Sequence, residues 1–157
     1  MAVTAYFQPK FQLNHLKNGK ANLASDTLKV GLIASSSPAL AARSVTQNYE
    51  FISDLLANNG SALTEEAGAG YSRLTVTGVS YAQSNLVDTL DFNDPSWSGA
   101  TFSDKYAFFY DETDSSATDA TRPLIAIWDL GGTQAVTGGV FTLNIAVTGL
   151  VTWTAAV

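Results

Sequence analysis

Three carboxylates lie close together in the middle of the chain, at Asp88, Asp91 and Asp94. Paired carboxylates hydrolyse glycosidic bonds when the fold holds them at a defined separation on either side of the sugar. Spacing along the sequence does not set that separation. A carbohydrate-active enzyme is therefore the weakest of the functional hypotheses that follow.

The three tryptophans, Trp97, Trp128 and Trp153, are a second feature that could serve a sugar site. An exposed indole ring offers a flat surface on which a sugar can stack. Aromatic residues in or near apolar strands are more often part of the core or of an interface. We expect Trp128 in the core.

A second group of acids consists of Asp111, Glu112, Asp114 and Asp119. Hard oxygen ligands of this kind bind calcium, but the stretch lacks the regular alternation and the central glycine of an EF-hand loop. We expect a solvated acidic loop between two strands, and calcium binding stays the alternative.

The sequence gives little support to a zinc site, a nucleophilic hydrolase or a nucleotide-binding loop. His15 is the single histidine and there is no cysteine, so zinc would lack its preferred nitrogen and sulfur ligands. No G-x-S-x-G nucleophile elbow occurs, and the glycines around Gly68-Ala69-Gly70 and Gly131-Gly132 match neither a phosphate loop nor a dinucleotide fingerprint. These glycines are expected to form turns. We predict that the protein is not an enzyme and binds no cofactor or metal.

Length and composition favour one folded domain over residues 1–157. The chain has 157 residues, 46% of them hydrophobic, and shows neither an internal repeat nor a linker composition. A net charge of −6 makes nucleic acid a poor partner, because affinity for phosphates depends on clustered Lys and Arg. No run reaches the roughly 20 apolar residues of a membrane span, and no signal peptide is evident. We expect no membrane partner.

The first part of the chain predicts a short helix and one strand. Pro9 suits the first helical position, Leu13 and Leu16 are spaced for one face, and Gly19 is a stop signal, so residues 1–24 are expected to be a helical segment. Residues 27–34 alternate as a half-buried strand does. The long excursion from 35 to 70 contains one candidate helix, within residues 49–56.

From Tyr71 onward the pattern predicts about six strands. They are expected near residues 71–81, 86–92, 105–110, 123–130, 140–147 and 150–154. Residues 107–110 and 124–128 are apolar on both strand faces, which indicates central strands covered on each side. The predicted fold is mainly β: a single antiparallel β-sandwich-like domain with a short N-terminal helix and a β-rich core over 25–157. The expected core residues are Leu28, Val30, Leu32, Leu74, Val76, Phe108, Ile125, Ile127, Phe141, Leu143 and Ile145.

Charge is distributed unevenly along the chain. The first thirty residues carry Lys10, Lys17, Lys20 and Lys29 against one acid, Asp26. We predict that this basic segment faces the partner. The predicted partner-binding residues are Phe7, Lys10, Phe11, Lys17 and Lys20, with the phenylalanines supplying apolar contact. The alternative is that the lysines only solvate a helix and a turn.

Several short segments, in a particular order, are similar to those of bacteriophage virion structural proteins. These segments are Ser25-Asp26-Thr27-Leu28-Lys29-Val30, Gly68-Ala69-Gly70-Tyr71, Lys105-Tyr106-Ala107, Pro123-Leu124-Ile125 and Asp129-Leu130-Gly131-Gly132. They span most of the chain. The chain thus resembles head decoration (cement) proteins or tail-associated structural proteins, and the resemblance carries no catalytic residues with it.

The resemblance implies a place in the virion. The leading hypothesis is a decoration protein that binds the outer head surface and stabilises it, with the major capsid protein or other virion proteins as partners. A homo-oligomer is expected, with a trimer favoured. The alternative is a tail-fibre or baseplate component with a structural or receptor-binding role.

Overall fold

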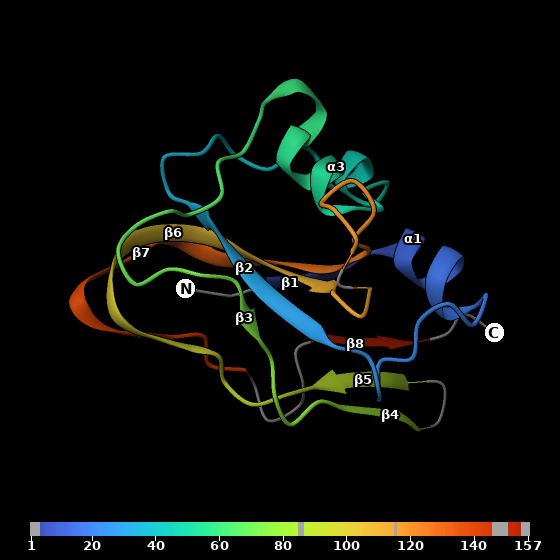
Figure 1. Cartoon of the computed structure of the whole chain (residues 1–157). Coiled ribbons are helices and arrows are strands. Elements are labelled where there is room, and N and C mark those ends of the chain that lie inside the picture. Colours follow the sequence, from blue (N-terminus) through green and yellow to red (C-terminus); the bar gives the residue numbers. More distant parts are fainter. Residues whose placement is uncertain (1–3, 85–86, 115, 146–150, 155–157) are drawn as a thin grey trace.

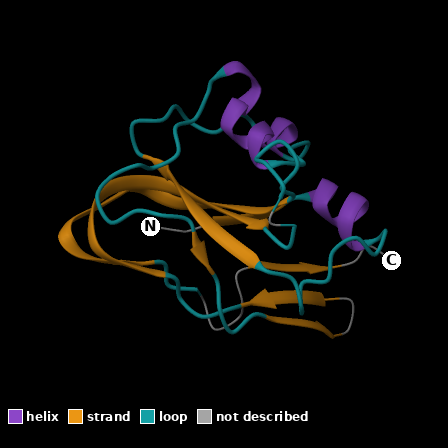
Figure 2. Ribbon diagram, in the orientation of Figure 1, coloured by secondary structure: helices purple, strands orange, loops and turns teal. Residues whose placement is uncertain are grey.

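The computed structural model describes residues 4–84, 87–114, 116–145 and 151–154, and in them the protein forms two antiparallel sheets (Figures 1 and 2). The larger sheet has the strand order β1-β7-β6-β2-β3, and the smaller has the order β4-β5-β8. The larger sheet contains β1 (Thr4–Phe7), β2 (Leu28–Ala34), β3 (Leu74–Thr75), β6 (Ser96–Asp111) and β7 (Leu124–Thr142). The smaller contains β4 (Ser80–Ser84), β5 (Val87–Asp91) and β8 (Val151–Thr154).

The two central strands of the larger sheet are β6 and β7, as their continuous apolar runs predict. Residues 107–110 and 124–127 are all buried, because both faces of the sheet are covered. One face packs on the smaller sheet, and the other lies beneath the helices, as Figure 1 shows. The predicted sandwich-like β fold with a short N-terminal helix is confirmed.

The core between the sheets joins residues from both layers. Leu90 of β5 lies in the same buried cluster as Val30, Phe109 and Trp128 of the larger sheet. Trp128 is thus a core residue, as expected. Of the predicted core, eight residues are buried, namely Leu28, Val30, Leu32, Val76, Phe108, Ile125, Ile127 and Leu143, whereas Leu74, Phe141 and Ile145 are partly buried and pack against the cluster.

The opposite face of the larger sheet is covered by two short helices, α2 (Arg43–Thr46) and α3 (Ile52–Ala57). The helix predicted within residues 49–56 corresponds to α3. It begins at Ile52 because the backbone before it is extended: Phe51 forms a β-bridge with Pro123. Asp54 accepts hydrogen bonds from the backbone N–H groups of Glu50 and Phe51, which caps the first turn.

The N-terminal segment is a strand followed by a helix. β1 pairs with β7 from Thr4 opposite Asp129 to Phe7 opposite Ala126. The predicted helix is present as α1 (Pro9–Phe11), which continues into one wide turn, η1 (Gln12–Leu16), closed by the Lys17 N–H donating to the Gln12 carbonyl. The sequence pattern missed β1, since four residues that pair with a strand more than a hundred positions away leave little local signal.

The glycine pair Gly131-Gly132 lies within β7, so its prediction as a turn is wrong. Opposite β6, Asp104 pairs with Gln134 while Tyr106 pairs with Asp129, so residues 130–133 bulge out opposite Lys105 alone. Gly131 and Gly132 adopt positive φ there, which only glycine does readily. The bulge lets the paired strands curl from one layer toward the other (Figure 1).

The remaining strand predictions are met in part. Residues 71–81 contain the short β3 and the start of β4, residues 86–92 contain β5, and residues 150–154 contain β8. The predicted bounds of the strand over 140–147 are wrong, because β7 ends at Thr142 and residues 143–145 are not strand. Residues 146–147 lie outside the described residues. β6 begins at Ser96, well before the predicted start at 105.

Candidate functional site

The predicted docking segment presents its charged side chains outward. Lys17 and Lys20 are exposed and Lys10 is partly exposed. Among the described residues, none of these three lysines takes part in an ion pair. Leu13, on the same helical segment, is 53% exposed, which is unusual for a large apolar side chain in this protein. We call Lys10, Leu13, Lys17 and Lys20 the basic helical patch.

The two predicted phenylalanines lie on the inner side of this segment. Phe11 is fully buried in the core between the sheets, and Phe7 packs edge-on against it at 6.0 Å between ring centroids. Phe11 was predicted to contact a partner, but a side chain with no exposed surface cannot do so in the intact fold. Its role in the structure is to hold the helix on the sheet, and Leu13 is the apolar group that the segment exposes.

His15 is tied into the same region by packing. Its ring stacks on Phe11 at 5.5 Å, and its Nε2 lies 3.4 Å from the Glu50 carboxylate. Burial lowers the pKa of His15, and the nearby Glu50 opposes that shift. His15 is thus a partly packed side chain, and no serine or second base joins it to form a catalytic group in the described contacts.

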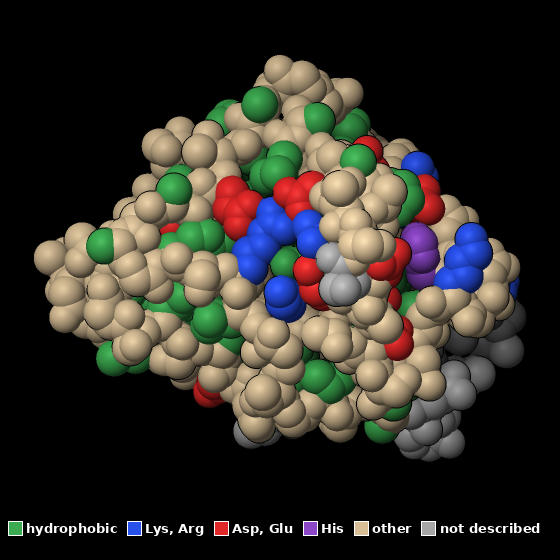
Figure 3. All heavy atoms as spheres, viewed as in Figure 1, with side chains coloured by type: hydrophobic (Ala, Val, Ile, Leu, Met, Phe, Trp, Pro, Cys, Tyr) green, Lys and Arg blue, Asp and Glu red, His purple; other side chains and the backbone are tan. Residues whose placement is uncertain are grey.

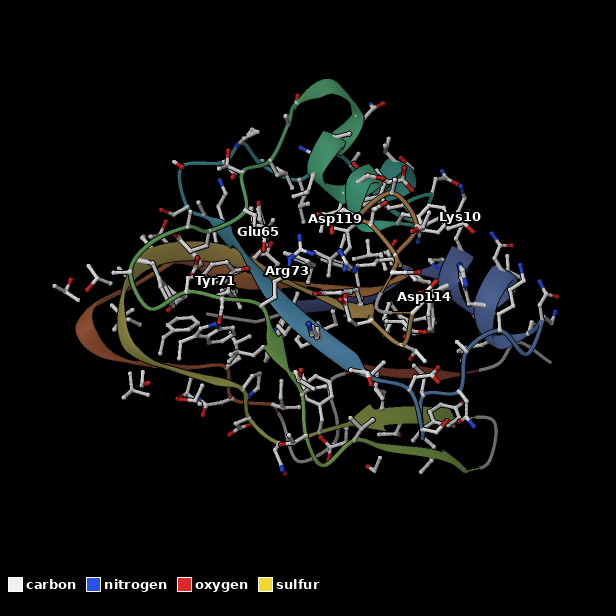
Figure 4. All side chains as sticks on the ribbon, viewed as in Figure 1. Lys10, Glu65, Tyr71, Arg73, Asp114 and Asp119 are labelled. Atoms are coloured by element: carbon white, nitrogen blue, oxygen red, sulfur yellow. The ribbon has the colours of Figure 1, made fainter. Side chains whose placement is uncertain are left out.

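A second cluster of charges lies in the middle of the helix-bearing side, where Figure 3 shows Lys and Arg intermixed with Asp and Glu. Arg73 is its centre. One edge of its guanidinium donates to Glu65 at 2.7 and 2.6 Å, and the other donates to Asp119 at 2.7 and 2.8 Å. Figure 4 shows Arg73 between these two carboxylates. Two bidentate contacts use four of the five N–H donors of the side chain.

The cluster continues through a second arginine. Arg122 donates to Asp119 at 3.2 Å and to Glu112 at 2.8 Å, and Lys29 lies 3.7 Å from Glu112. We call these six residues, Lys29, Glu65, Arg73, Glu112, Asp119 and Arg122, the Arg73 network. Its three cations and three anions balance, so the cluster offers no net charge to a ligand.

The surroundings of Arg73 fix its position and its charge. The guanidinium carbon lies 5.4 Å from the ring centre of Phe108 and 5.3 Å from that of Tyr110. Burial opposes the charged form, but hydrogen bonds to Asp119 and Glu65 outweigh it and raise the pKa of Arg73. The hydrogen bond from Arg73 in turn lowers the pKa of Asp119. Burial raises the pKa of Tyr110 to about 12.

The expected acidic loop is therefore only partly solvated. Asp114 is exposed, as predicted, and caps its own loop by accepting from Ser116. Glu112 and Asp119 are held in the Arg73 network, and Asp111 is buried. Arginines from distant parts of the chain reach this loop, which the local sequence could not indicate. Within the described residues, no group of three or more His, Cys, Asp or Glu side chains is placed to hold a metal ion.

The other candidate groups are not brought together as a site. Asp91 accepts from the backbone of Phe92, and Asp94 accepts from the backbone of Ile145, while the side chain of Asp88 lies outside the described residues. Trp97 is buried and its indole N–H donates to the Ser72 carbonyl at 2.7 Å, so its ring is not a surface for sugar stacking. The side chain of Trp153 also lies outside the described residues.

Two of the hollows that described residues line lie against the larger sheet. One, of about 260 Å³, lies between the 39–46 segment and the sheet, where Tyr6, Tyr106 and Asp129 contribute polar atoms. Asp129 already accepts from the Gly131 N–H at 2.9 Å. The other, of about 380 Å³, is lined by Trp128, Phe141 and neighbouring residues of β7. Neither gathers a nucleophile, a base and an orienting group.

Comparisons of the chain with models of protein families, with curated proteins and with solved structures gave no match. In the described part, no helix is long and apolar enough to cross a membrane.

Proposed function

We propose that this protein acts by binding rather than by catalysis, and that it is a bacteriophage decoration (cement) protein located in the virion, on the outer surface of the head. The short sequence segments described above support the virion assignment, because they resemble those of phage structural proteins and follow the same order. The major capsid protein is the proposed partner, and a homotrimer is the proposed assembly.

One observation carries the docking part of the proposal: within the described residues, the lysines of the basic helical patch have no ion-pair partner. Four other cations have side chains that the structure describes: Arg73, Arg122 and Lys29 belong to the Arg73 network, and Lys105 donates to the Ser37 carbonyl. Positive groups left free on a chain of net charge −6 favour an acidic partner surface. Leu13 adds an apolar contact beside them.

The location in the virion is tested by labelling intact phage particles with an antibody raised against the purified protein. Label over the head is the result we expect. Label confined to the tail would replace the proposal with the tail-fibre or baseplate alternative. Antibody that has been absorbed with the purified protein is the control, and particles that bind no more specific antibody than this control would contradict a place on the virion surface.

A further inference from the structure

The strand β6 changes neighbours halfway along its length, and Asp104 lies at this point. β2 pairs with β6 until Ala34 stands opposite Asp104, and the last contact is the Ser35 N–H donating to the Ser103 carbonyl at 2.7 Å. Beyond it the 61–73 loop takes the place of β2, where the Thr101 N–H donates to the Ala69 carbonyl at 2.9 Å. At Asp104, β6 therefore stops pairing with β2, and the 61–73 loop becomes its neighbour.

Asp104 is buried there without a hydrogen-bond donor. Its exposed fraction is 0%, and neither carboxylate oxygen accepts a hydrogen bond from any described N–H or O–H group. A buried ionised carboxylate without a donor is strongly unfavourable, and a protein avoids this by keeping the group protonated or by supplying a partner. A second carboxyl, that of Glu66, lies against the same stretch of β6, since its Oε1 and the Phe102 Cβ are 3.0 and 2.8 Å from the position that a Cβ on Gly68 would take. A side-chain hydrogen bond with Glu66 and its negative charge both raise the pKa of Asp104.

Glu66 differs from Asp104 in that its carboxylate has backbone donors. Its Oε1 accepts hydrogen bonds from the backbone N–H groups of Ala67 at 2.8 Å and Gly68 at 2.7 Å. The loop packs so closely here that a Cβ on Gly68 would lie 2.5 Å from the Thr101 carbonyl oxygen. A hydrogen bond between the two carboxyl groups needs one proton. We place it on Asp104, because no N–H or O–H group donates to the Asp104 carboxylate.

We propose that Asp104 and Glu66 share one proton, with Asp104 as the donor, and that this buried pair makes the attachment of the 61–73 loop to β6 sensitive to pH. Among the side chains that the structure describes, no cation pairs with Asp104 in place of the proton. Lys105, next along β6, donates to the Ser37 carbonyl and lies over the Tyr106 ring, and Arg73 is bound to Glu65 and Asp119. Gln134, opposite on β7, is neutral. The inference does not depend on the proposed function.

The direction of the effect follows from linkage. Burial, then the hydrogen bond and the negative charge of Glu66, raise the pKa of Asp104 from 3.8 to about 8. The folded protein keeps this proton at a pH where the unfolded chain has released it. The stabilisation is complete below about pH 4, declines as the pH rises toward about 8, and shows no further loss above that value.

The test compares chemical-denaturation midpoints at about pH 5 and about pH 8.5 for the wild type, Asp104→Asn and Asp114→Asn. The asparagine amide at 104 can donate to Glu66 but does not titrate. We expect a clear fall of the wild-type midpoint between the two pH values and a much smaller fall for Asp104→Asn. Asp114→Asn removes one charge from the exposed loop and should follow the wild type.

Hydrogen exchange tests whether the loss of stability at high pH occurs in the 61–73 loop. After correction for the intrinsic rate, the Ala67 and Gly68 amides of the wild type should exchange at least about tenfold faster at the higher pH, and those of Asp104→Asn should not. Equal midpoint shifts in the wild type and in Asp104→Asn would overturn the proposal. A second result would also overturn it: at pH 8.5, added calcium raises the midpoint of the wild type but not that of Asp104→Asn. The two carboxylates would then hold a cation and not a shared proton.

A second variant keeps the test valid if Asp104→Asn does not fold. In Glu66→Gln the amide donates to Asp104 and the neighbouring negative charge is gone, so Asp104 should ionise at a lower pH. The fall in midpoint between pH 5 and pH 8.5 should then shrink. A fall as large as that of the wild type would contradict the shared proton.

Discussion

The Arg73 network and the basic helical patch both gather cations, but they use them differently. In the network every cation meets a carboxylate, and the charges sum to zero. In the patch, Lys10, Lys17 and Lys20 have no ion-pair partner among the described residues. The first arrangement fastens loops to the sheet, and the second leaves charge available to another molecule. Exposure and pairing, rather than the number of cations, distinguish a structural cluster from a candidate docking surface.

The largest expected change in stability concerns the inner side of the helical segment that carries the basic helical patch. Phe11→Ala should lower the free energy of unfolding by about 3 to 5 kcal/mol, because it removes a fully buried ring and leaves a cavity. Leu13→Ala, on the exposed side of the same segment, should change it by less than about 0.5 kcal/mol. Urea denaturation measures both. Equal effects would mean that the segment is not anchored as described.

The next effect concerns the centre of the network. Arg73→Met should destabilise the protein by about 2 to 3 kcal/mol, since it leaves the partly buried Glu65 and Asp119 without their common partner. The side chain of Arg73 keeps 18% exposure, so the cost is below that of a fully buried pair. Lys10→Met is the matched control and should have little effect. If the two variants lost the same stability, the contrast between network and patch would fail.

Low pH should weaken the Arg73 network. The pKa of Asp119 is lowered by the hydrogen bond from Arg73, so its stabilising contribution is present above about pH 4 and is lost as the pH falls further. Asp119→Asn lacks this contribution at every pH. The difference in midpoint between wild type and Asp119→Asn should therefore narrow between about pH 5 and about pH 2.5. A difference that stays constant would show that Asp119 is not stabilised as an ion.

The smallest effect is expected for the patch itself. Changing Lys10, Lys17 and Lys20 together to glutamine should alter the free energy of unfolding by less than about 1 kcal/mol in total, because side chains that are exposed or partly exposed and have no ion-pair partner in the described residues contribute little. Thermal or urea unfolding checks this. A larger loss would mean that the lysines have structural partners and are not a free surface.

Local pattern was sufficient for much of the fold and little of the site. The apolar runs at 107–110 and 124–128 predicted the central strands, and Pro9 predicted the helix start, since these signals depend on neighbouring residues. The glycine pair at 131–132 was misleading, because a bulge and a turn have the same local chemistry. Nothing in the sequence predicted that Arg73 would bind Asp119, 46 positions away, or that Asp104 would face Glu66.

The basic helical patch is the docking surface that the proposed function requires. The direct test measures the rate of binding to undecorated phage capsids across a salt titration, for the wild type and for the triple variant Lys10→Gln, Lys17→Gln, Lys20→Gln. Gln47→Glu, Ser61→Glu, Ala62→Glu is the control, since it gives the same net charge through exposed residues near α2 and α3. We predict that the lysine variant binds more slowly and with a weaker salt dependence, while the control keeps the wild-type salt dependence. Wild-type rates for the lysine variant at every salt concentration would contradict the account.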